Sequence, residues 1–164
     1  MNNDVIIFVM GVSGSGKSTI GKLLAERLDY PFFDGDDFHP KANIEKMAQG
    51  KPLNDTDRKS WLERLNRLSI EHKNKGAVIA CSALKESYRQ TLSKHLNENC
   101  RFVYLEGSMD EINQRLAQRT DHFMPPALLK SQFETLEVPK NAIRVSINNS
   151  PEKIVNTVVK VLET

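Results

Sequence analysis

The fold of this chain is decided by residues 5–18, which read Val-Ile-Ile-Phe-Val-Met-Gly-Val-Ser-Gly-Ser-Gly-Lys-Ser. The first six of them form an unbroken apolar run, which is typical of a strand buried on both faces of a parallel sheet. The last eight match the pattern G-x-x-x-x-G-K-[ST] without a gap. A helix over about residues 16–28 should follow, because apolar residues recur at helical spacing at Ile20, Leu23, Leu24 and Leu28.

A strand, a glycine-rich turn and a helix in this order predict a P-loop, which cradles the phosphates of a nucleotide. Glycines let successive N–H groups point at one anion, and the helix N-terminus adds a partial positive charge. Lys17 is expected to act in catalysis on the β- and γ-phosphates of ATP, and Ser18 to ligate Mg²⁺. The predicted nucleotide-binding residues are Gly11, Val12, Ser13, Gly14, Ser15, Gly16, Lys17 and Ser18.

Further strands alternate with helical patterns along the rest of the chain. Short apolar or β-branched runs occur at residues 31–33, 77–81, 102–105 and 143–147. Between them, apolar stripes at helical spacing predict helices, as at Trp61, Leu62, Leu65 and Leu68. Five strands alternating with helices predict one α/β domain over residues 1–164, built on an open parallel sheet. Its ligands should bind at the carboxyl ends of the strands.

Composition narrows the functional classes. The net charge is only +2, from 23 basic and 21 acidic residues, so nucleic acid is not an expected partner. The opening apolar run of six residues is too short for a signal peptide or a membrane span, and a cytoplasmic protein is expected. Two cysteines, Cys81 and Cys100, are expected to be buried free thiols rather than a disulfide framework.

The acidic residues separate a kinase from other P-loop proteins. A GTPase should carry D-x-x-G and N-K-x-D, but the first is missing and the nearest match to the second, at residues 74–77, lacks the aspartate. Asp34 and Asp36 instead follow the second predicted strand. Transfer to an alcohol needs a carboxylate that orients the hydroxyl and accepts its proton, and Asp36 is the candidate for this role. Asp34 is expected to hold Mg²⁺, directly or through water.

Several longer motifs resemble the gluconokinase family, which is related to shikimate kinase. They are residues 34–40 (Asp-Gly-Asp-Asp-Phe-His-Pro), 43–47 (Asn-Ile-Glu-Lys-Met), 50–58 (Gly-Lys-Pro-Leu-Asn-Asp-Thr-Asp-Arg), 81–85 (Cys-Ser-Ala-Leu-Lys), 122–124 (His-Phe-Met) and 131–137 (Ser-Gln-Phe-Glu-Thr-Leu-Glu). The resemblance implies ATP-dependent phosphorylation of D-gluconate to 6-phospho-D-gluconate. It also implies the P-loop NTPase fold of the small nucleoside and shikimate kinases, and a homodimer.

The basic residues fit a sugar acid as substrate. A gluconate site needs cations for the carboxylate, and Arg58, Lys85 and Arg89 are the candidates. Lys85 and Arg89 are four residues apart and are expected on one helical face. His39 either bonds a substrate hydroxyl or is a turn residue before a proline, and both interpretations stay open. Trp61 is expected in the core.

Residues of about 120–140 carry three prolines and are expected to be an inserted mobile lid that closes on ATP. Arg115 and Arg119 precede it on one helix face. Arg119 is expected to be catalytic, as an arginine that stabilises the transferring phosphoryl group, and Arg115 to contact the nucleotide. The alternative for both is a solvated helix end with salt bridges.

Two other functions remain to be weighed against gluconate kinase. One is a shikimate-like or other small sugar-acid kinase of the same fold. The other is a nucleotide-dependent switch, which the missing guanine motif and the Asp34/Asp36 pair disfavour.

Overall fold

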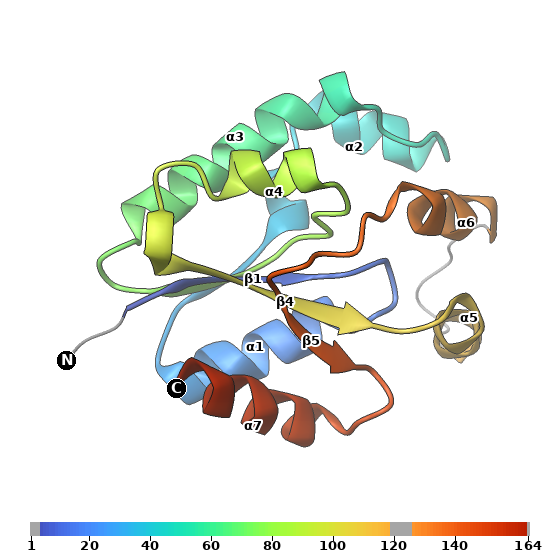
Figure 1. Ribbon diagram of the computed structural model, residues 1–164. Coiled ribbons are helices and arrows are strands. Elements are labelled where there is room, and N and C mark those ends of the chain that lie inside the picture. Colours follow the sequence, from blue (N-terminus) through green and yellow to red (C-terminus); the bar gives the residue numbers. More distant parts are fainter. Residues whose placement is uncertain (1–3, 119–125, 164) are drawn as a thin grey trace.

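The computed structural model describes residues 4–118 and 126–163 of the chain (Figure 1). Five strands form one sheet in the order β2-β3-β1-β4-β5, and every neighbouring pair is parallel. The strands are β1 (Ile6–Met10), β2 (Phe32–Asp34), β3 (Ala77–Ala80), β4 (Cys100–Glu106) and β5 (Ile143–Ser146). The predicted open five-stranded parallel sheet is therefore confirmed.

Helices cover both faces of the sheet in a three-layer arrangement (Figure 1). The helices α1 (Lys17–Leu28) and α7 (Pro151–Leu162) pack on one face. On the other face lie α2 (Lys41–Ala48), α3 (Asp55–Glu71) and α4 (Glu86–Leu92). Two more helices, α5 (Met109–Ala117) and α6 (Pro126–Thr135), lie beyond the carboxyl ends of the strands. Short 3₁₀ turns occur at η1 (Gly35–Phe38) and η2 (Asn97–Asn99).

The central strand β1 joins the two halves of the core. All five of its residues are fully buried, as the unbroken apolar run predicts. Ile7 and Val9 pack in the cluster under α1 and α7, whereas Ile6, Phe8 and Met10 pack in the cluster under α3 and α4. Burying each such side chain stabilises the fold by about 1.5–3 kcal/mol, so β1 holds both layers to one strand.

The two cysteines are free, with Cys81 buried and Cys100 half-buried, as expected. Burial raises the pKa of both thiols to about 12, so they stay protonated and unreactive at neutral pH. Among the helices in the described ranges, none combines the length and the apolar character needed to span a bilayer.

The segment predicted to be an inserted mobile lid contains a regular helix. Residues 126–135 form the regular helix α6, and residues 119–125 lie outside the described part of the chain. Proline is compatible with the first position of a helix, because the N–H that it lacks has no intrahelical acceptor there. Leu129 is 1% exposed in the core, and Phe133, one turn later, packs against the same cluster. This apolar pair fixes α6 against the domain.

Gly35 lies where the backbone passes close to β3. A β-carbon added there would lie 2.5 Å from the carbonyl oxygen of Ala80, a backbone atom that cannot move aside easily. Gly35→Ala should therefore destabilise the protein by about 1–3 kcal/mol in urea unfolding. A variant whose unfolding free energy stays within about 0.5 kcal/mol of wild type would contradict this close approach.

Candidate active site

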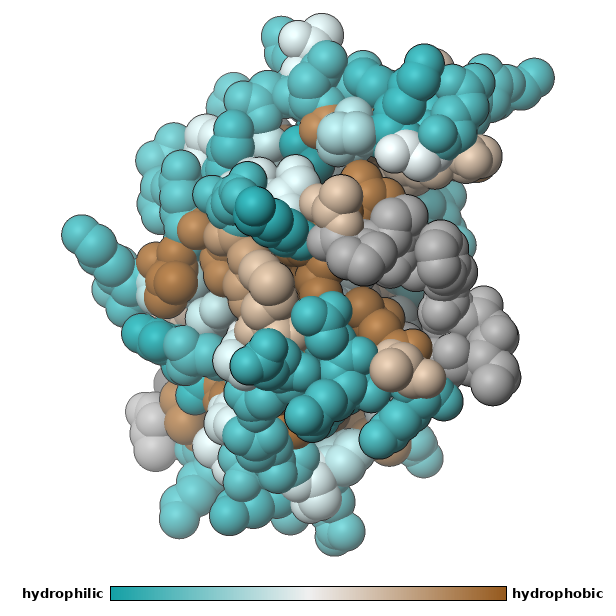
Figure 2. All heavy atoms as spheres, turned by 90° about the vertical axis from the view of Figure 1, so that its right-hand side faces the viewer, coloured by the Kyte–Doolittle hydropathy of each residue, from teal (hydrophilic) through white to brown (hydrophobic). Residues whose placement is uncertain are grey.

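The P-loop connects the end of β1 to the start of α1. Gly16 precedes the helix with a φ of 98°, a left-handed conformation that glycine adopts without strain. The N–H groups of a helix's first turn have no acceptor within the helix, and such a helix start is suited to bind an anion. Figure 2 looks onto this side of the molecule, where an apolar band lies between hydrophilic upper and lower parts.

Ser15 has a buried hydroxyl that is suited to bind an anion in the P-loop. Its side chain is 2% exposed, and its Oγ is the buried side-chain polar atom without a hydrogen-bond partner in the part of the chain described. Buried hydroxyls are nearly always paired, so an orphan in this loop is suited to a ligand oxygen. The P-loop thus fits the phosphates of a nucleotide.

Lys17 is folded back over the same loop. Its Nζ donates hydrogen bonds to the carbonyl oxygens of Gly11 and Val12, each at 3.1 Å. The ammonium group is therefore held beside the N–H groups of the loop, where a phosphate would bring its negative charge.

Ser18 and Asp34, the predicted magnesium ligands, are hydrogen-bonded to each other. Ser18 Oγ donates to Asp34 Oδ2 at 2.9 Å, while Asp34 Oδ1 accepts from the backbone N–H of Asp36 at 3.0 Å. A hydroxyl and a carboxylate beside a phosphate loop fit Mg²⁺, which takes oxygen ligands and usually keeps phosphate and water oxygens. Residues 4–118 and 126–163 contain no group of three or more His, Cys, Asp or Glu side chains placed so that they could hold a metal ion by themselves.

Asp36 sits on η1, with its side chain 85% exposed in the open site. Desolvation by the surrounding protein and the nearby Asp34 charge raise its pKa, whereas Lys17 opposes the shift. A raised pKa makes Asp36 a better proton acceptor than an ordinary aspartate.

His39 lies next to Asp36 and is 7% exposed. Its ring stacks on Trp61 at a centroid distance of 4.1 Å, and Trp61 Nε1 donates to Gly35 O at 2.7 Å, so Trp61 is a core residue as expected. Burial and the positive charge of Arg58 lower the pKa of His39 to about 4, so the ring is neutral at pH 7.

The tautomer of His39 follows from its neighbour. Asn43 Nδ2 donates to Asp57 O at 2.8 Å, which fixes its amide orientation, and it lies 3.2 Å from His39 Nδ1. Nδ1 is therefore an acceptor and Nε2 carries the proton. Nε2 is 4.0 Å from Asp36 Oδ1, so the neutral His39 ring presents an N–H donor beside the Asp36 carboxylate.

A cavity of about 520 Å³ lies between α3, the start of α4 and α6. It contains two of the three predicted cations, Arg58 and Lys85. Arg58 Nη1 donates to Tyr88 Oη at 3.0 Å, and Lys85 Nζ donates to Asp55 Oδ1 at 3.1 Å. The lining residues are Leu53, Asn54, Asp55, Thr56, Arg58, Lys85, Ser131 and Thr135.

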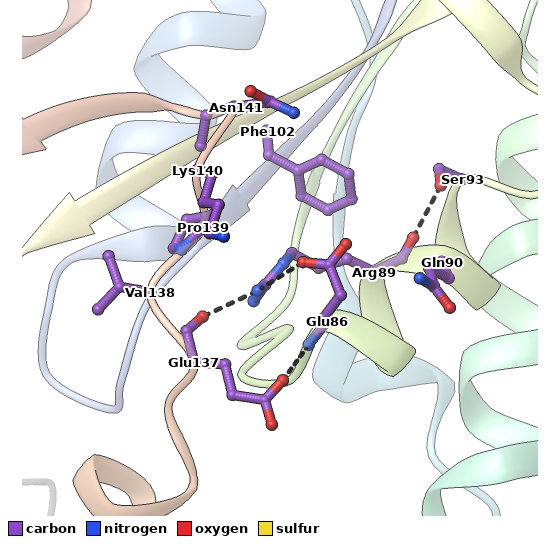
Figure 3. A pocket seen from close by; sticks show the side chains of 11 residues that line it. Glu86, Arg89, Gln90, Ser93, Phe102, Glu137, Val138, Pro139, Lys140 and Asn141 are labelled. Carbon is purple, nitrogen blue, oxygen red and sulfur yellow. Dashed lines mark hydrogen bonds and ion pairs between the residues drawn. The ribbon is translucent and has the colours of Figure 1, made fainter.

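Arg89, the third predicted cation, does not line this cavity. Lys85 is the extended N-cap residue of α4, which begins at Glu86, whereas Arg89 lies within the helix. Arg89 is 5% exposed and donates to Ala83 O at 2.7 Å and Glu137 O at 2.8 Å (Figure 3). It braces α4 against the chain after α6, and it lines a separate cavity of about 570 Å³ that contains no P-loop residue.

Gln132 is a site residue that the sequence reading missed. The backbone N–H of Ser13 donates to Gln132 Oε1 at 2.7 Å, and Gln132 Nε2 donates to Ser13 Oγ at 3.0 Å. These two bonds attach α6 to the P-loop across 119 residues of sequence. The quoted 131–137 motif contained Gln132, but no local pattern indicates its partner.

Of the two arginines predicted to contact the nucleotide and the transferring phosphoryl group, the structure describes only Arg115. Arg115 lies beside the P-loop, since a β-carbon on Gly16 would be 3.7 Å from its Nη1, and its Nη2 donates to Ile147 O. Arg119 lies outside the described residues.

A phosphate loop, an acidic pair that could activate a hydroxyl and a neighbouring cationic cavity make this domain a small-molecule kinase of the P-loop class. Consistent with that class, the family model for shikimate kinase matches residues 13–163. The chain is 44% identical over 169 residues to the thermoresistant gluconokinase of Escherichia coli strain K12, covering 99% of this chain and 96% of that one. It is therefore a member of the gluconokinase family.

Two further proteins that are similar to this chain are also gluconokinases. The thermosensitive gluconokinase of Escherichia coli strain K12 is 49% identical over 147 residues, covering 86% of this chain and 78% of its own length. The crystal structure of a gluconokinase from Sinorhizobium meliloti 1021 superposes with a TM-score of 0.90 at 40% identity, covering 99% of this chain and 94% of that chain.

Lys17→Ala should reduce kinase activity by about 10²-fold or more, because the substitution removes a charge aimed at the transferring phosphates. Thermal unfolding should stay close to wild type. Lys22→Ala is the matched control, since Lys22 is exposed on the same helix. Substantial activity in Lys17→Ala would contradict the P-loop assignment.

Asp36→Asn should lower turnover by about 10²–10⁴-fold, the range typical of a lost general base. ATP binding measured by calorimetry should change little. Asp37→Asn changes an exposed neighbouring carboxylate and should keep turnover within a few-fold of wild type. If Asp36→Asn behaves like this control, the base lies elsewhere.

Proposed function

We propose that the chain phosphorylates the terminal hydroxyl of D-gluconate with ATP, forming 6-phospho-D-gluconate and ADP. The observation that carries the proposal is the cationic cavity at Arg58 and Lys85, which opens next to the kinase site. The names of the relatives support the same substrate. The shikimate-like alternative is not favoured, because both of these relatives are named gluconokinases.

Asp36 is proposed to orient the acceptor hydroxyl and take its proton as the hydroxyl oxygen attacks the γ-phosphorus. His39, with its proton on Nε2, donates a hydrogen bond to a substrate hydroxyl near Asp36. The P-loop N–H groups and Lys17 bind the phosphates. Ser18 and Asp34 would hold Mg²⁺, which neutralises phosphate charge when bound.

The far end of the substrate is proposed to lie in the cavity beside α6. Arg58 and Lys85 would bind the carboxylate, and the hydroxyls of Ser131 and Thr135 are available to the polyol chain. Arg89 is left out of this site, because its guanidinium is already paired with backbone carbonyls.

The helix α6 is proposed to form part of the lid. Gln132 binds the P-loop residue Ser13, while Ser131 and Thr135 line the acceptor cavity, so one helix borders both substrates. A change in α6 on ATP binding would therefore reach the acceptor side. Arg115, and Arg119 by its position in the sequence, are proposed to contact the nucleotide and the transferring phosphoryl group.

A cytoplasmic location and a homodimer complete the proposal. The free thiols Cys81 and Cys100 are consistent with a reducing compartment. The homodimer rests on the family resemblance.

Gluconate should be a substrate and glucose should not, with a difference in kcat/KM of about 10³ or more. Glucose has the same terminal hydroxyl but no carboxylate, so it cannot make the charge-assisted hydrogen bonds with Arg58 and Lys85 that are proposed to hold gluconate. A coupled assay of ADP release with gluconate, glucose and shikimate measures this. Comparable rates on glucose and gluconate would refute the carboxylate site, and a preference for shikimate would replace the proposed substrate.

A further inference from the structure

The acceptor cavity already contains a bound carboxylate, which belongs to the chain itself. Lys85 Nζ lies 3.1 Å from Asp55 Oδ1 and 3.2 Å from Oδ2, so it contacts both oxygens. The hydroxyl of Tyr88 donates to Asp55 Oδ1, and Arg58 Nη1 donates to that same hydroxyl at 3.0 Å. Lys85 and Tyr88, which could bind the carboxylate of a sugar acid, therefore both contact Asp55, and Arg58 is linked to Asp55 through Tyr88.

These contacts are of a kind that a ligand can replace. The Asp55 side chain is 64% exposed and that of Lys85 is 31% exposed, and both line the cavity. Ion pairs with this exposure are weak, and their partners exchange readily. The hydrogen bonds from Tyr88 and Lys85 lower the pKa of Asp55, so it is charged at neutral pH.

We propose that Asp55 is a specificity-determining residue that occupies the carboxylate position until a sugar acid displaces it. This inference rests on the proposed function. An anion must compete with Asp55 for Lys85 and Tyr88, and only one whose hydroxyl chain makes further contacts gains enough to do so. Small anions are therefore kept out, and selectivity is obtained by opposing the wrong ligand as well as by binding the right one.

The proposal makes a prediction opposite to that of an ordinary binding residue. Asp55→Asn removes the competitor and leaves Lys85 with no internal anion among the contacts described for it. The KM for gluconate should fall about two- to five-fold, the range that corresponds to loss of a competing exposed ion pair, with kcat unchanged. Inhibition by acetate, a carboxylate without hydroxyls, should strengthen by a similar factor.

Asp57→Asn is the matched control. Asp57 is in the same helical turn, carries the same charge and has its own cation, with Lys46 Nζ at 2.6 Å. It does not line the cavity. This control should lower thermal stability, because Asp57 belongs to the capping box of α3. Asp57 reaches the cavity only through its charge on Arg58, so the KM for gluconate and the inhibition by acetate should change less than in Asp55→Asn.

The outcomes separate the proposals. An unchanged or higher KM in Asp55→Asn, or an equal fall in Asp57→Asn, would overturn the role of Asp55. The first result would make Asp55 a structural residue or a ligand of the substrate hydroxyls, and the second a general charge effect. If Asp55→Asn does not fold, Asp55→Ser carries the same expectation. A wild-type protein without gluconate-dependent ATP turnover would instead refute the proposed function.

Discussion

The burial of β1 in the middle of the sheet is the constraint on which the rest of the site depends. Its five residues are fully buried between two helical layers, so the end of the strand is fixed. The P-loop begins at that fixed end, and α1 returns along the sheet from it. The helix α1 connects β1 to β2, which lie on opposite sides of β3 in the sheet. Its first turn places Ser18 Oγ 2.9 Å from Asp34 Oδ2 at the end of β2.

The two helical layers supply different parts of the proposed site. The α1 layer supplies the phosphate site, whereas α3 and the start of α4 supply the cations and the carboxylate of the acceptor cavity. The helix α6 borders both, through Gln132 on the P-loop and Thr135 in the cavity. The geometry thereby supports a kinase in which the occupancy of one site can affect the other.

The sequence predicted the elements that depend on local pattern. The five strands, the P-loop and the core position of Trp61 all follow from apolar periodicity or from a contiguous motif. The arrangement of side chains around the acceptor depended on tertiary contacts instead. Arg89 shows the limit, because its spacing from Lys85 suggested a shared site, whereas its guanidinium donates to the carbonyl oxygens of Ala83 and Glu137 outside the cavity.

Asp55 lies in the motif at residues 50–58 and Gln132 in the motif at residues 131–137, but neither motif predicts which residue its side chain contacts. Gln132 contacts a residue 119 positions away, and Asp55 contacts Lys85 from 30 positions away. Such contacts are set by the docking of α6 and α3 on the domain, which a single sequence does not specify. Arg119 lies outside the described residues and stays a prediction.

The central claim is that the γ-phosphoryl group of ATP is transferred to one oxygen of gluconate. The most direct test is NMR spectroscopy of the product formed from ¹³C-labelled gluconate and ATP, which locates phosphorus through its coupling to carbon. The account predicts a single phosphomonoester on the terminal carbon, with one ADP formed for each. ADP formation without a phosphorylated sugar acid, or phosphorus on any other carbon, would contradict it.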